Sequence, residues 1–369
     1  MSSTQRHFQK IDFLRGIAIL TVVQAHFVWY CFPAYAGVVA VDGGHSLRGV
    51  ILLNLVPRII GWGGVTVFIL VSGFLLHLGM LKDQAGFTLR GFYSRRFWRV
   101  YPPYLLALLV FSLFLEKGLF TSRGGWLTFL FHCFSLQNLF TRTYFSVNPT
   151  FWCLALEVQL YLFYVLLLSG RSGWGIKPTV MLTFLLSIAW QAIGMRVGGL
   201  AESLPWTNSV VSIWVIWAVG ALLAEAFFNE KRLWAFLSLR DRLFALAGLL
   251  LACSVTPANA LLQYAAGIIC VFLMDWFLHA QWITLRRRPA RMLIAIGLFS
   301  FSLFLIHQPL IPLLAEGFNA LSPRYPGYRL VGGIAALAVI FLLSYCMYRW
   351  VELPSIRMGN RLRRARRIE

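Results

Sequence analysis

Long apolar runs recur from one end of the chain to the other, and they constrain its fold more than any other feature. Each is close to the length that crosses a hydrocarbon core of roughly 30 Å as a helix. They lie at about 12–31, 62–81, 101–116, 151–168, 179–195, 209–228, 243–257, 259–278, 293–315 and 329–350. Hydrophobic residues make up 59% of the sequence and charged residues 12%, about half the share usual in soluble domains. The sequence therefore predicts an all-α polytopic membrane protein with about ten transmembrane helices.

The formal net charge of +20 does not point to a nucleic-acid partner, because the basic residues fall in short clusters between apolar runs. Such clusters follow the positive-inside rule. They are Arg6 with Lys10, Lys82 to Arg99, Lys231 to Arg242, Arg286 to Arg291, and Arg357 to Arg367. If all are cytoplasmic, the ten spans alternate correctly and both termini lie in the cytoplasm. We predict membrane lipids as partners and no nucleic acid.

Both termini lie on one side only if the number of spans is even, which requires that residues 126–140 do not cross the membrane. This segment, "WLTFLFHCFSLQNLF", is short and polar for a span, so we predict a re-entrant or interfacial segment on the outer side. A crossing helix there would place every later loop, and the C-terminus, on the opposite side of the membrane. We predict one integral domain, 1–356, followed by a basic cytoplasmic tail, 357–369, on the anionic inner leaflet.

The six cysteines show no CxxC spacing, so neither a metal site nor a disulfide framework is indicated. The N-terminal segment has an alternative interpretation to a first membrane span. Arg6 and Lys10, the first apolar run and "AYA" at 34–36 also resemble a secretory signal peptide with its cleavage site.

The first apolar run reads "DFLRGIAILTVVQAH" from residue 12 and carries three ionisable residues. Eleven residues of α-helix advance by about 1100°, which is three turns and about 20°, and rise about 16 Å. Arg15 and His26 therefore share one helix face, and Asp12 can pair with Arg15 three residues on. The two charged residues also suit a helix-end anchor. A histidine half-way through a membrane, however, faces the protein interior or a water-filled cavity, which makes His26 a candidate catalytic residue.

The stretch "FYSRRFWRVYPPY" gathers Arg95, Arg96 and Arg99 at the predicted cytoplasmic side. Guanidinium groups bind phosphates bidentately. Pro102 suits the first turn of the next span, whose free N–H groups would add donors. The cluster predicts a site for a ligand with several phosphates, such as coenzyme A, with a simple inside-positive anchor as the alternative.

The stretch "NPTFWCLALEVQLYLF" reads as a capped helix that carries a carboxylate into the membrane. Asn148 and Pro149 suit the cap and the first helical residue. Glu157 then lies about 13 Å inward, with Tyr161 one turn further on. At that depth a carboxylate is paired, protonated or functional. It could orient a histidine, bind sugar hydroxyls, or pair with a buried arginine for stability alone.

Three shorter stretches give weaker signals. "VSGFLL" contains Ser72 and Gly73, small residues that favour close helix packing. "SFSLFLIHQP" places His307 just before Pro309 at an expected helix break, and "VELP" places Glu352 at the end of the final span. Each alone is more typical of structure than of catalysis.

Taken in order, these stretches resemble the acyltransferase-3 family, integral-membrane enzymes that O-acylate bacterial surface glycans and some small molecules. The matching elements cover residues 11–354 and read "IDFLRGIAILTVVQAH", "VFILVSGFLL", "RRFWRVYP", "FWCLALEVQLYLF", "SFSLFLIHQP" and "VELP". The resemblance implies ten helices with both termini inside, in agreement with the charge pattern.

The resemblance also implies a reaction and a site. It implies acyl transfer from cytoplasmic acyl-CoA, with acetyl-CoA as the default donor and no metal. The acceptor would be a hydroxyl of a surface polysaccharide or its lipid-linked precursor, on the extracytoplasmic side of the bacterial inner membrane. By this resemblance, Arg15 and His26 are the essential pair of residues, and Arg96 and Arg99 contact the acyl donor. The candidate site also includes Glu157 as a catalytic residue, Arg95 in the donor site, and Tyr161, Ser72 and His307 as substrate contacts.

Two mechanisms and two rival functions stay open. His26 acts either as a general base on the acceptor hydroxyl or as a nucleophile that forms an acyl-histidine. Membrane-embedded ionisable residues also mark transporters and flippases, although internal repeats and paired interrupted helices are lacking. The other rival is a non-catalytic partner in a glycan-export complex. Acceptor specificity is expected in the outward loops at 32–61 and 117–150.

Overall fold

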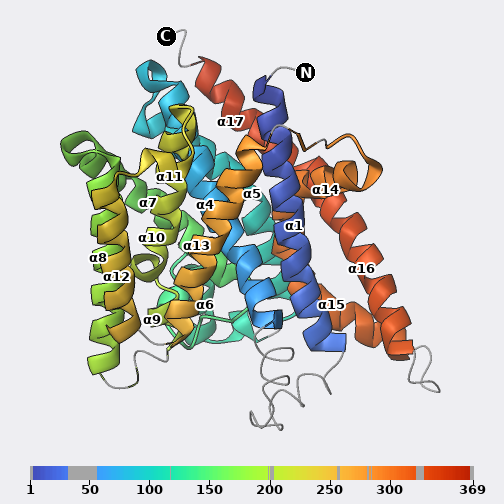
Figure 1. Ribbon diagram of the computed structural model, residues 1–369. Helices are drawn as coiled ribbons and strands as arrows, with labels where there is room; N and C mark the ends of the chain where they lie inside the picture. The colour runs from blue at the N-terminus through green and yellow to red at the C-terminus, as the bar shows by residue number, and fades with distance from the viewer. Residues whose placement is uncertain are drawn as a thin grey trace.

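The structure is a computed structural model that describes residues 3–31, 56–116, 118–197, 199, 203–255, 258–280, 282–283, 285–320 and 328–365. Every regular element in these ranges is a helix (Figure 1), which confirms the predicted all-α class. The longer helices are α1 (Ser3–Cys31), α4 (Val56–Lys82), α5 (Leu89–Phe114), α7 (Phe151–Trp174), α8 (Ile176–Arg196), α10 (Val210–Phe228), α12 (Leu239–Val255), α13 (Ala258–His279), α15 (Ser300–Ala320) and α16 (Tyr328–Met347).

Shorter helices connect or extend these. They are α6 (Arg123–Cys133), α9 (Leu204–Thr207), α11 (Leu233–Phe236), α14 (Arg288–Leu298) and α17 (Leu353–Ala365). Single helical turns occur at η2 (Gln84–Gly86), η3 (Leu119–Thr121), η4 (Gln137–Leu139) and η6 (Tyr348–Glu352), of which η6 is a π-helical turn.

Seven of the described helices are long and apolar enough to cross a membrane, and a bent pair makes eight if it counts as one span. The bent pair is α14 and α15, which meet at 79°. The chain is thus a multi-pass membrane protein, but the count of about ten spans is not confirmed. The other two predicted spans fall on α12, with 17 residues, and on α13, whose described apolar part is only Gln263–His279.

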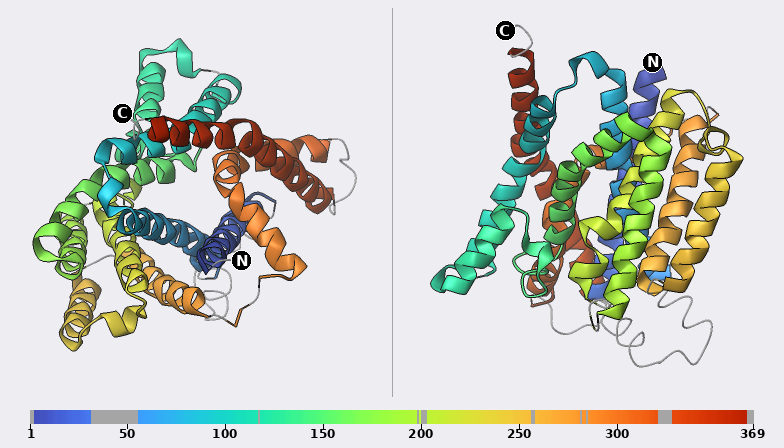
Figure 2. Two further views of the ribbon diagram at one scale, coloured as in Figure 1. Left: turned by 90° about the horizontal axis from the view of Figure 1, so that it is seen from above. Right: turned by 90° about the vertical axis from the view of Figure 1, so that its left-hand side faces the viewer.

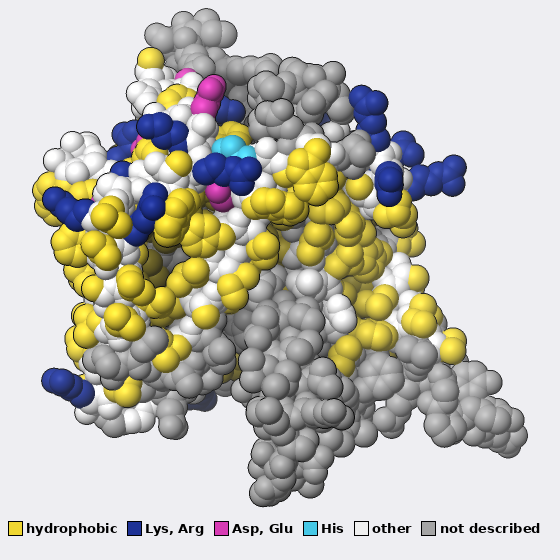
Figure 3. Space-filling model, in the orientation of Figure 1, with side chains coloured by type: hydrophobic (Ala, Val, Ile, Leu, Met, Phe, Trp, Pro, Cys, Tyr) yellow, Lys and Arg dark blue, Asp and Glu magenta, His cyan; other side chains and the backbone are white. Residues whose placement is uncertain are grey.

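The two ends of the described chain lie at the same end of the helix bundle. α1 begins there and α17 ends there (Figures 1 and 2), as expected if both termini lie on one side of the membrane. In Figure 3 most Lys and Arg side chains on the visible face gather toward that end, above a broad hydrophobic surface. This distribution is the one that the positive-inside rule predicts.

Three further predictions concern single segments of the chain. The proposed cleavage site at 34–36 and most of the outward loop at 32–61 lie outside the described residues. The predicted tail from residue 357 begins inside α17, and the division into domain and tail stays a prediction. The segment 126–140 includes most of α6, whose eleven residues rise only about 16 Å. That length is too short to cross a membrane and supports a re-entrant or interfacial placement.

Helix α4 packs between α1 and α10 and forms the centre of the bundle (Figure 2). Its contact with α10 depends on small residues from both helices. A Cβ on Gly73 would lie 2.1 Å from the Trp217 carbonyl oxygen, and one on Gly220 would lie 2.3 Å from that of Leu70. Both positions therefore need glycine, as close packing between membrane helices often does, and the predicted packing role of Gly73 is confirmed.

Lys10 joins the start of α1 to the end of α13. Its buried ammonium group donates to the backbone oxygens of Phe277, Leu278 and Ala280, at 2.9, 3.1 and 2.9 Å. The last carbonyls of a helix have no partner within the helix and carry partial negative charge. Lys10 therefore caps α13 and fixes the helix that carries Arg15 and His26.

Candidate active site

A cavity of about 280 Å³ lies among helices α1, α4, α5, α7, α10 and α15. Its walls are mostly apolar, but polar side chains from several of these helices converge in it. They include six residues that the sequence singled out: Arg15, Ser72, Arg96, Arg99, Glu157 and Tyr161. The structure thus brings together residues up to 146 positions apart. Arg95, on the same helix as Arg96, is not among the lining residues.

The three cavity arginines are the main cationic feature of this site. Arg15 forms an ion pair with Asp12 at 3.5 Å, as the spacing predicted. In the part of the chain that the structure describes, neither Arg96 nor Arg99 pairs with a carboxylate, and the buried Nε of Arg96 has no hydrogen-bond partner. Guanidinium groups that are partly removed from water favour anionic or acceptor partners. The cavity therefore suits an anionic ligand.

The predicted helix N-terminus beside these arginines is wrong. Helix α5 begins at Leu89, after the Thr88 cap, and continues through Pro102 and Pro103 to Phe114. A proline is suited to the first turn but also occurs within membrane helices, where neighbouring groups satisfy the freed carbonyls. Arg96 and Arg99 therefore project from the middle of a helix, and no free N–H groups adjoin them there.

Glu157 enters the cavity from α7 and accepts two hydrogen bonds. The Tyr161 hydroxyl donates to its Oε1 over a short distance, and the Ser72 hydroxyl donates to the same oxygen at 3.4 Å. Trp217 Nε1 donates in turn to Ser72 at 3.3 Å. Of the three roles considered for Glu157, neither a direct arginine pair nor a histidine contact occurs among the described residues. Among the described residues, the other carboxylate oxygen of Glu157 has no hydrogen-bond partner.

His26 meets His307 rather than the cavity arginines. His26 Nδ1 lies 2.9 Å from His307 Nε2, and His307 is fully buried. The other ring nitrogen of His307, Nδ1, lies 3.0 Å from the backbone oxygens of both Leu303 and Phe304. Carbonyl oxygens only accept hydrogen bonds, so His307 Nδ1 carries the proton. In the neutral pair, His26 Nδ1–H then donates to His307 Nε2, and His26 Nε2 keeps its lone pair.

Phe304 connects the two parts of the site. Its side chain lines the cavity together with Phe68, and the two rings meet edge to face with centroids 6.4 Å apart. The same Phe304 ring lies 6.0 Å from the ring of His307. Phe304 therefore lies between Phe68, another lining residue of the cavity, and the ring of His307.

Glu352 has a larger part in the site than its sequence position suggested. It is 1% exposed, in the π-helical turn η6, and its Oε2 accepts from the Ser302 hydroxyl at 2.6 Å. The charges of Arg99 and Arg15 act on this carboxylate. A π-helical turn often marks a functional site, but its extra residue gives no signal in the sequence.

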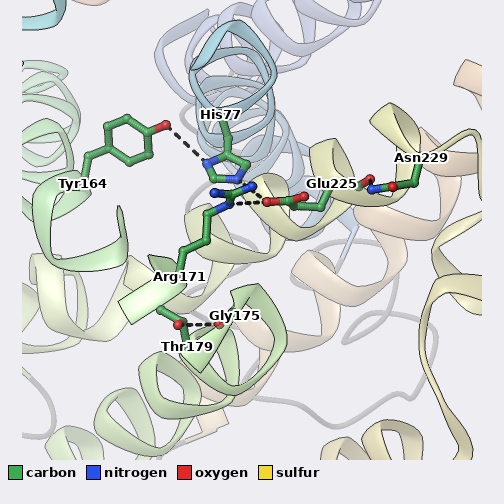
Figure 4. A network of polar contacts seen from close by, with 7 residues as sticks. All are labelled: His77, Tyr164, Arg171, Gly175, Thr179, Glu225 and Asn229. Carbon is green, nitrogen blue, oxygen red and sulfur yellow. Dashed lines mark hydrogen bonds and ion pairs between the residues drawn. The ribbon is translucent and has the colours of Figure 1, made fainter. Parts of the chain in front are cut away.

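A second buried polar cluster lies outside the cavity, between α4, α7 and α10 (Figure 4). His77 is fully buried, with its Nδ1 3.2 Å from the Tyr164 hydroxyl and its Nε2 3.0 Å from Glu225 Oε1. Arg171 Nε donates to the same carboxylate oxygen. Sequence reasoning missed this cluster. The signal was there, because His77 and Glu225 are ionisable residues inside apolar runs.

The chain belongs to the acyltransferase-3 family, because the model of that family, described as an acyltransferase domain, matches residues 8–345. It is similar to the peptidoglycan O-acetyltransferase OatA of Listeria monocytogenes serovar 1/2a (strain ATCC BAA-679 / EGD-e), with 23% identity across 97% of this chain. The chain spans 58% of the length of that relative. No solved structure matches the chain.

Metal chemistry has no obvious site in the described residues. No group of three or more His, Cys, Asp or Glu side chains there could hold a metal ion. The polar groups that the site does offer are guanidinium groups, carboxylates and two imidazoles, which suit anion binding and proton transfer.

Proposed function

We propose that this protein transfers an acyl group, by default acetyl, from cytoplasmic acyl-CoA to a glycan hydroxyl on the extracytoplasmic side of the bacterial inner membrane. The observation that carries the proposal is the two-part site. A cavity with three arginines adjoins, across Phe304, a histidine pair with one free lone pair. Family membership favours this reaction over transport or a non-catalytic role in export.

The arginines would hold the donor. Arg96 and Arg99 lack carboxylate partners among the described residues and would contact the phosphates together with Arg15. Arg95 does not line the cavity and would contribute at its edge. Guanidinium–phosphate pairs are strong and directional. The thioester arm would then extend toward Phe304 and the histidines.

His26 would act as the general base. Its Nε2 lone pair takes the proton of the acceptor hydroxyl, while the hydroxyl oxygen bonds to the thioester carbonyl carbon. The carbon–sulfur bond then breaks, and the coenzyme A thiolate leaves and takes up a proton. His307 would keep His26 in the tautomer that this step needs, since its own Nε2 accepts the Nδ1 proton. An acyl-histidine relay through the same nitrogen is the alternative.

Glu157 and its neighbours would bind the acceptor. Glu157 accepts from Tyr161 and Ser72, and its second oxygen is placed to accept from a sugar hydroxyl. A relative that is a peptidoglycan O-acetyltransferase supports a cell-wall polysaccharide as the acceptor. Its lipid-linked precursor is the alternative acceptor that we propose.

The proposal is tested by thiol release from acetyl-CoA in inverted membrane vesicles of the host that contain the protein. Acetyl-pantetheine, which lacks the nucleotide phosphates, is the comparison donor. We expect Arg96→Gln to raise KM for acetyl-CoA roughly 10- to 100-fold, as the loss of a charged hydrogen bond implies, and to leave KM for acetyl-pantetheine nearly unchanged. Arg90→Gln, an exposed position on the same helix, is the matched control. A transporter would release no thiol, and equal KM changes for both donors would contradict the donor site.

A further inference from the structure

Helix α15 contains a break in its hydrogen bonding that a distant residue repairs. The helix runs through Pro309, which has no N–H to donate to the carbonyl four residues earlier. That carbonyl belongs to Leu305. The fully buried Asn148 donates its Nδ2 to the Leu305 oxygen at 2.7 Å, from a position 157 residues away in the chain. Asn148 therefore replaces the missing backbone donor.

The orientation of the Asn148 amide is fixed by its other end. Its Oδ1 accepts from the Thr150 backbone N–H at 3.0 Å and from the Thr150 hydroxyl at 2.8 Å. Because the oxygen already has two donors, the NH₂ group must face Leu305. The Thr150 hydroxyl oxygen also lies 3.3 Å from the Phe304 oxygen, but its one proton cannot serve this oxygen and Asn148 Oδ1 at once, so Asn148 supplies the main side-chain donor to this turn of α15.

That turn also holds His307. The proton on His307 Nδ1 is bound by the oxygens of Leu303 and Phe304, the two carbonyls that directly precede Leu305. A buried carbonyl left without a donor turns toward another partner or recruits water. Rotation of the Leu305 peptide would shift the neighbouring carbonyls, and with them the ring that contacts His26.

We propose that Asn148 is a positioning residue that sets the orientation of His307 and, through it, the tautomer of His26. The inference rests on the proposed function for its kinetic consequence, but its structural part stands alone. The same residue joins the start of α7, which carries Glu157, to the turn of α15 that carries His307. Asn148 thereby sets the position of the carboxylate helix relative to the histidine helix.

Asn148→Asp isolates the contact with Leu305. The aspartate keeps an oxygen for Thr150 but places a second oxygen, not a donor, against the Leu305 carbonyl. We expect kcat for acetyl-CoA turnover to fall roughly 10- to 100-fold, the range for one unsatisfied buried hydrogen-bonding group. KM for acetyl-CoA should change less than about twofold, since Asn148 does not line the cavity. Asn229→Asp is the control for the chemical change alone, because Asn229 is exposed and its Nδ2 also donates to a backbone oxygen, that of Glu225, at 2.7 Å.

Pro309→Ala provides the decisive second change. The alanine restores an N–H that can donate to Leu305. The fold-loss of kcat caused by Asn148→Asp should therefore be at least about fivefold smaller in that background. A general loss of folding would not be rescued in this way. Equal losses in both backgrounds, or wild-type kcat in Asn148→Asp, would overturn the proposal.

A readout without turnover separates this inference from the proposed function. In protein labelled with ¹⁵N-histidine, the ring signals of His26 and His307 are assigned by their loss in His26→Ala and His307→Ala. We expect two Nδ1-protonated rings in the wild type and in Asn229→Asp, and altered His307 signals in Asn148→Asp. Unaltered signals would overturn the positioning role even if Pro309→Ala alone is inactive. A wild-type protein that releases no thiol but shows these signals would overturn only the proposed function.

Discussion

His26 Nδ1 lies 2.9 Å from His307 Nε2, and the hydrogen bond between them has a defined direction. The carbonyls of Leu303 and Phe304 hold the proton of His307 on Nδ1, so His307 can only accept from His26 while both rings are neutral. This relationship leaves the lone pair of His26 on Nε2, the nitrogen that the proposed mechanism uses.

His307 variants test that direction. We expect His307→Leu to lower kcat at least about 100-fold, since a misplaced general base loses its contribution. His307→Gln should retain more activity because its amide oxygen can still accept from His26. KM for acetyl-CoA should stay near the wild-type value in both variants, because His307 does not line the cavity. Steady-state thiol release measures these values, and wild-type kcat in His307→Leu would exclude the predicted role.

Phe304 is expected to limit the length of the acyl group. Phe304 lines the cavity, and its ring lies 6.0 Å from that of His307. Phe304→Ala should raise kcat/KM for butyryl-CoA relative to acetyl-CoA about tenfold, since two more buried methylenes contribute about 1.6 kcal/mol. Competition between the two donors measures the ratio. An unchanged ratio in a folded variant would place the acyl group elsewhere.

Lys10 is expected to contribute to stability. Lys10→Met keeps the apolar stem but removes three hydrogen bonds to the end of α13. We expect the free energy of unfolding to fall by roughly 2–4 kcal/mol, because the carbonyls lose a charged donor. Thermal unfolding in one detergent measures the change against Lys231→Met, an exposed control. Equal unfolding temperatures for the two variants would contradict the capping role.

His132, in the short helix α6, should make stability depend on pH. Burial lowers the pKa of its imidazole to about 4, and a hydrogen bond to Ser146 opposes this shift. The unfolded chain, with a histidine pKa near 6.5, takes up the proton first as the pH falls. The contribution of His132 is therefore complete above about pH 6.5 and is lost between about pH 6.5 and 4, up to about 3 kcal/mol.

The variant His132→Gln checks this prediction, because it removes the titrating group and leaves a side chain that can still bond to Ser146. Its unfolding temperature should fall less than that of the wild type between about pH 7 and pH 4. Parallel curves for the two proteins would show that His132 is not the source of the effect.

Local spacing predicted the parts of the site that single helices form. The eleven-residue interval placed Arg15 and His26 on one face of α1, and the three-residue interval paired Asp12 with Arg15. The one-turn interval that places Tyr161 beside Glu157 on α7 followed in the same way. These relationships depend on helix geometry alone, which sequence specifies well.

Contacts between distant helices could not be predicted. His307 was assigned to the substrate because nothing in "SFSLFLIHQP" indicates that its ring meets His26, 281 residues away. Proline occurs both at helix starts and within membrane helices. Pro102 therefore predicts a helix start that is too late in the chain, because α5 begins at Leu89. Asn148 was expected to cap α7, which instead begins at Phe151, and its bond to Leu305 appears only in the assembled fold.

The central claim is that this chain acylates a surface glycan through His26. The most direct measurement is the content of base-labile acyl groups on purified surface glycans, by NMR, after deletion of the gene and its restoration as wild type or as His26→Ala at equal membrane levels. We predict loss on deletion, full recovery with the wild type and no recovery with His26→Ala. Unchanged acyl content in all strains would contradict the glycan acceptor, and full recovery with His26→Ala would contradict the role of His26.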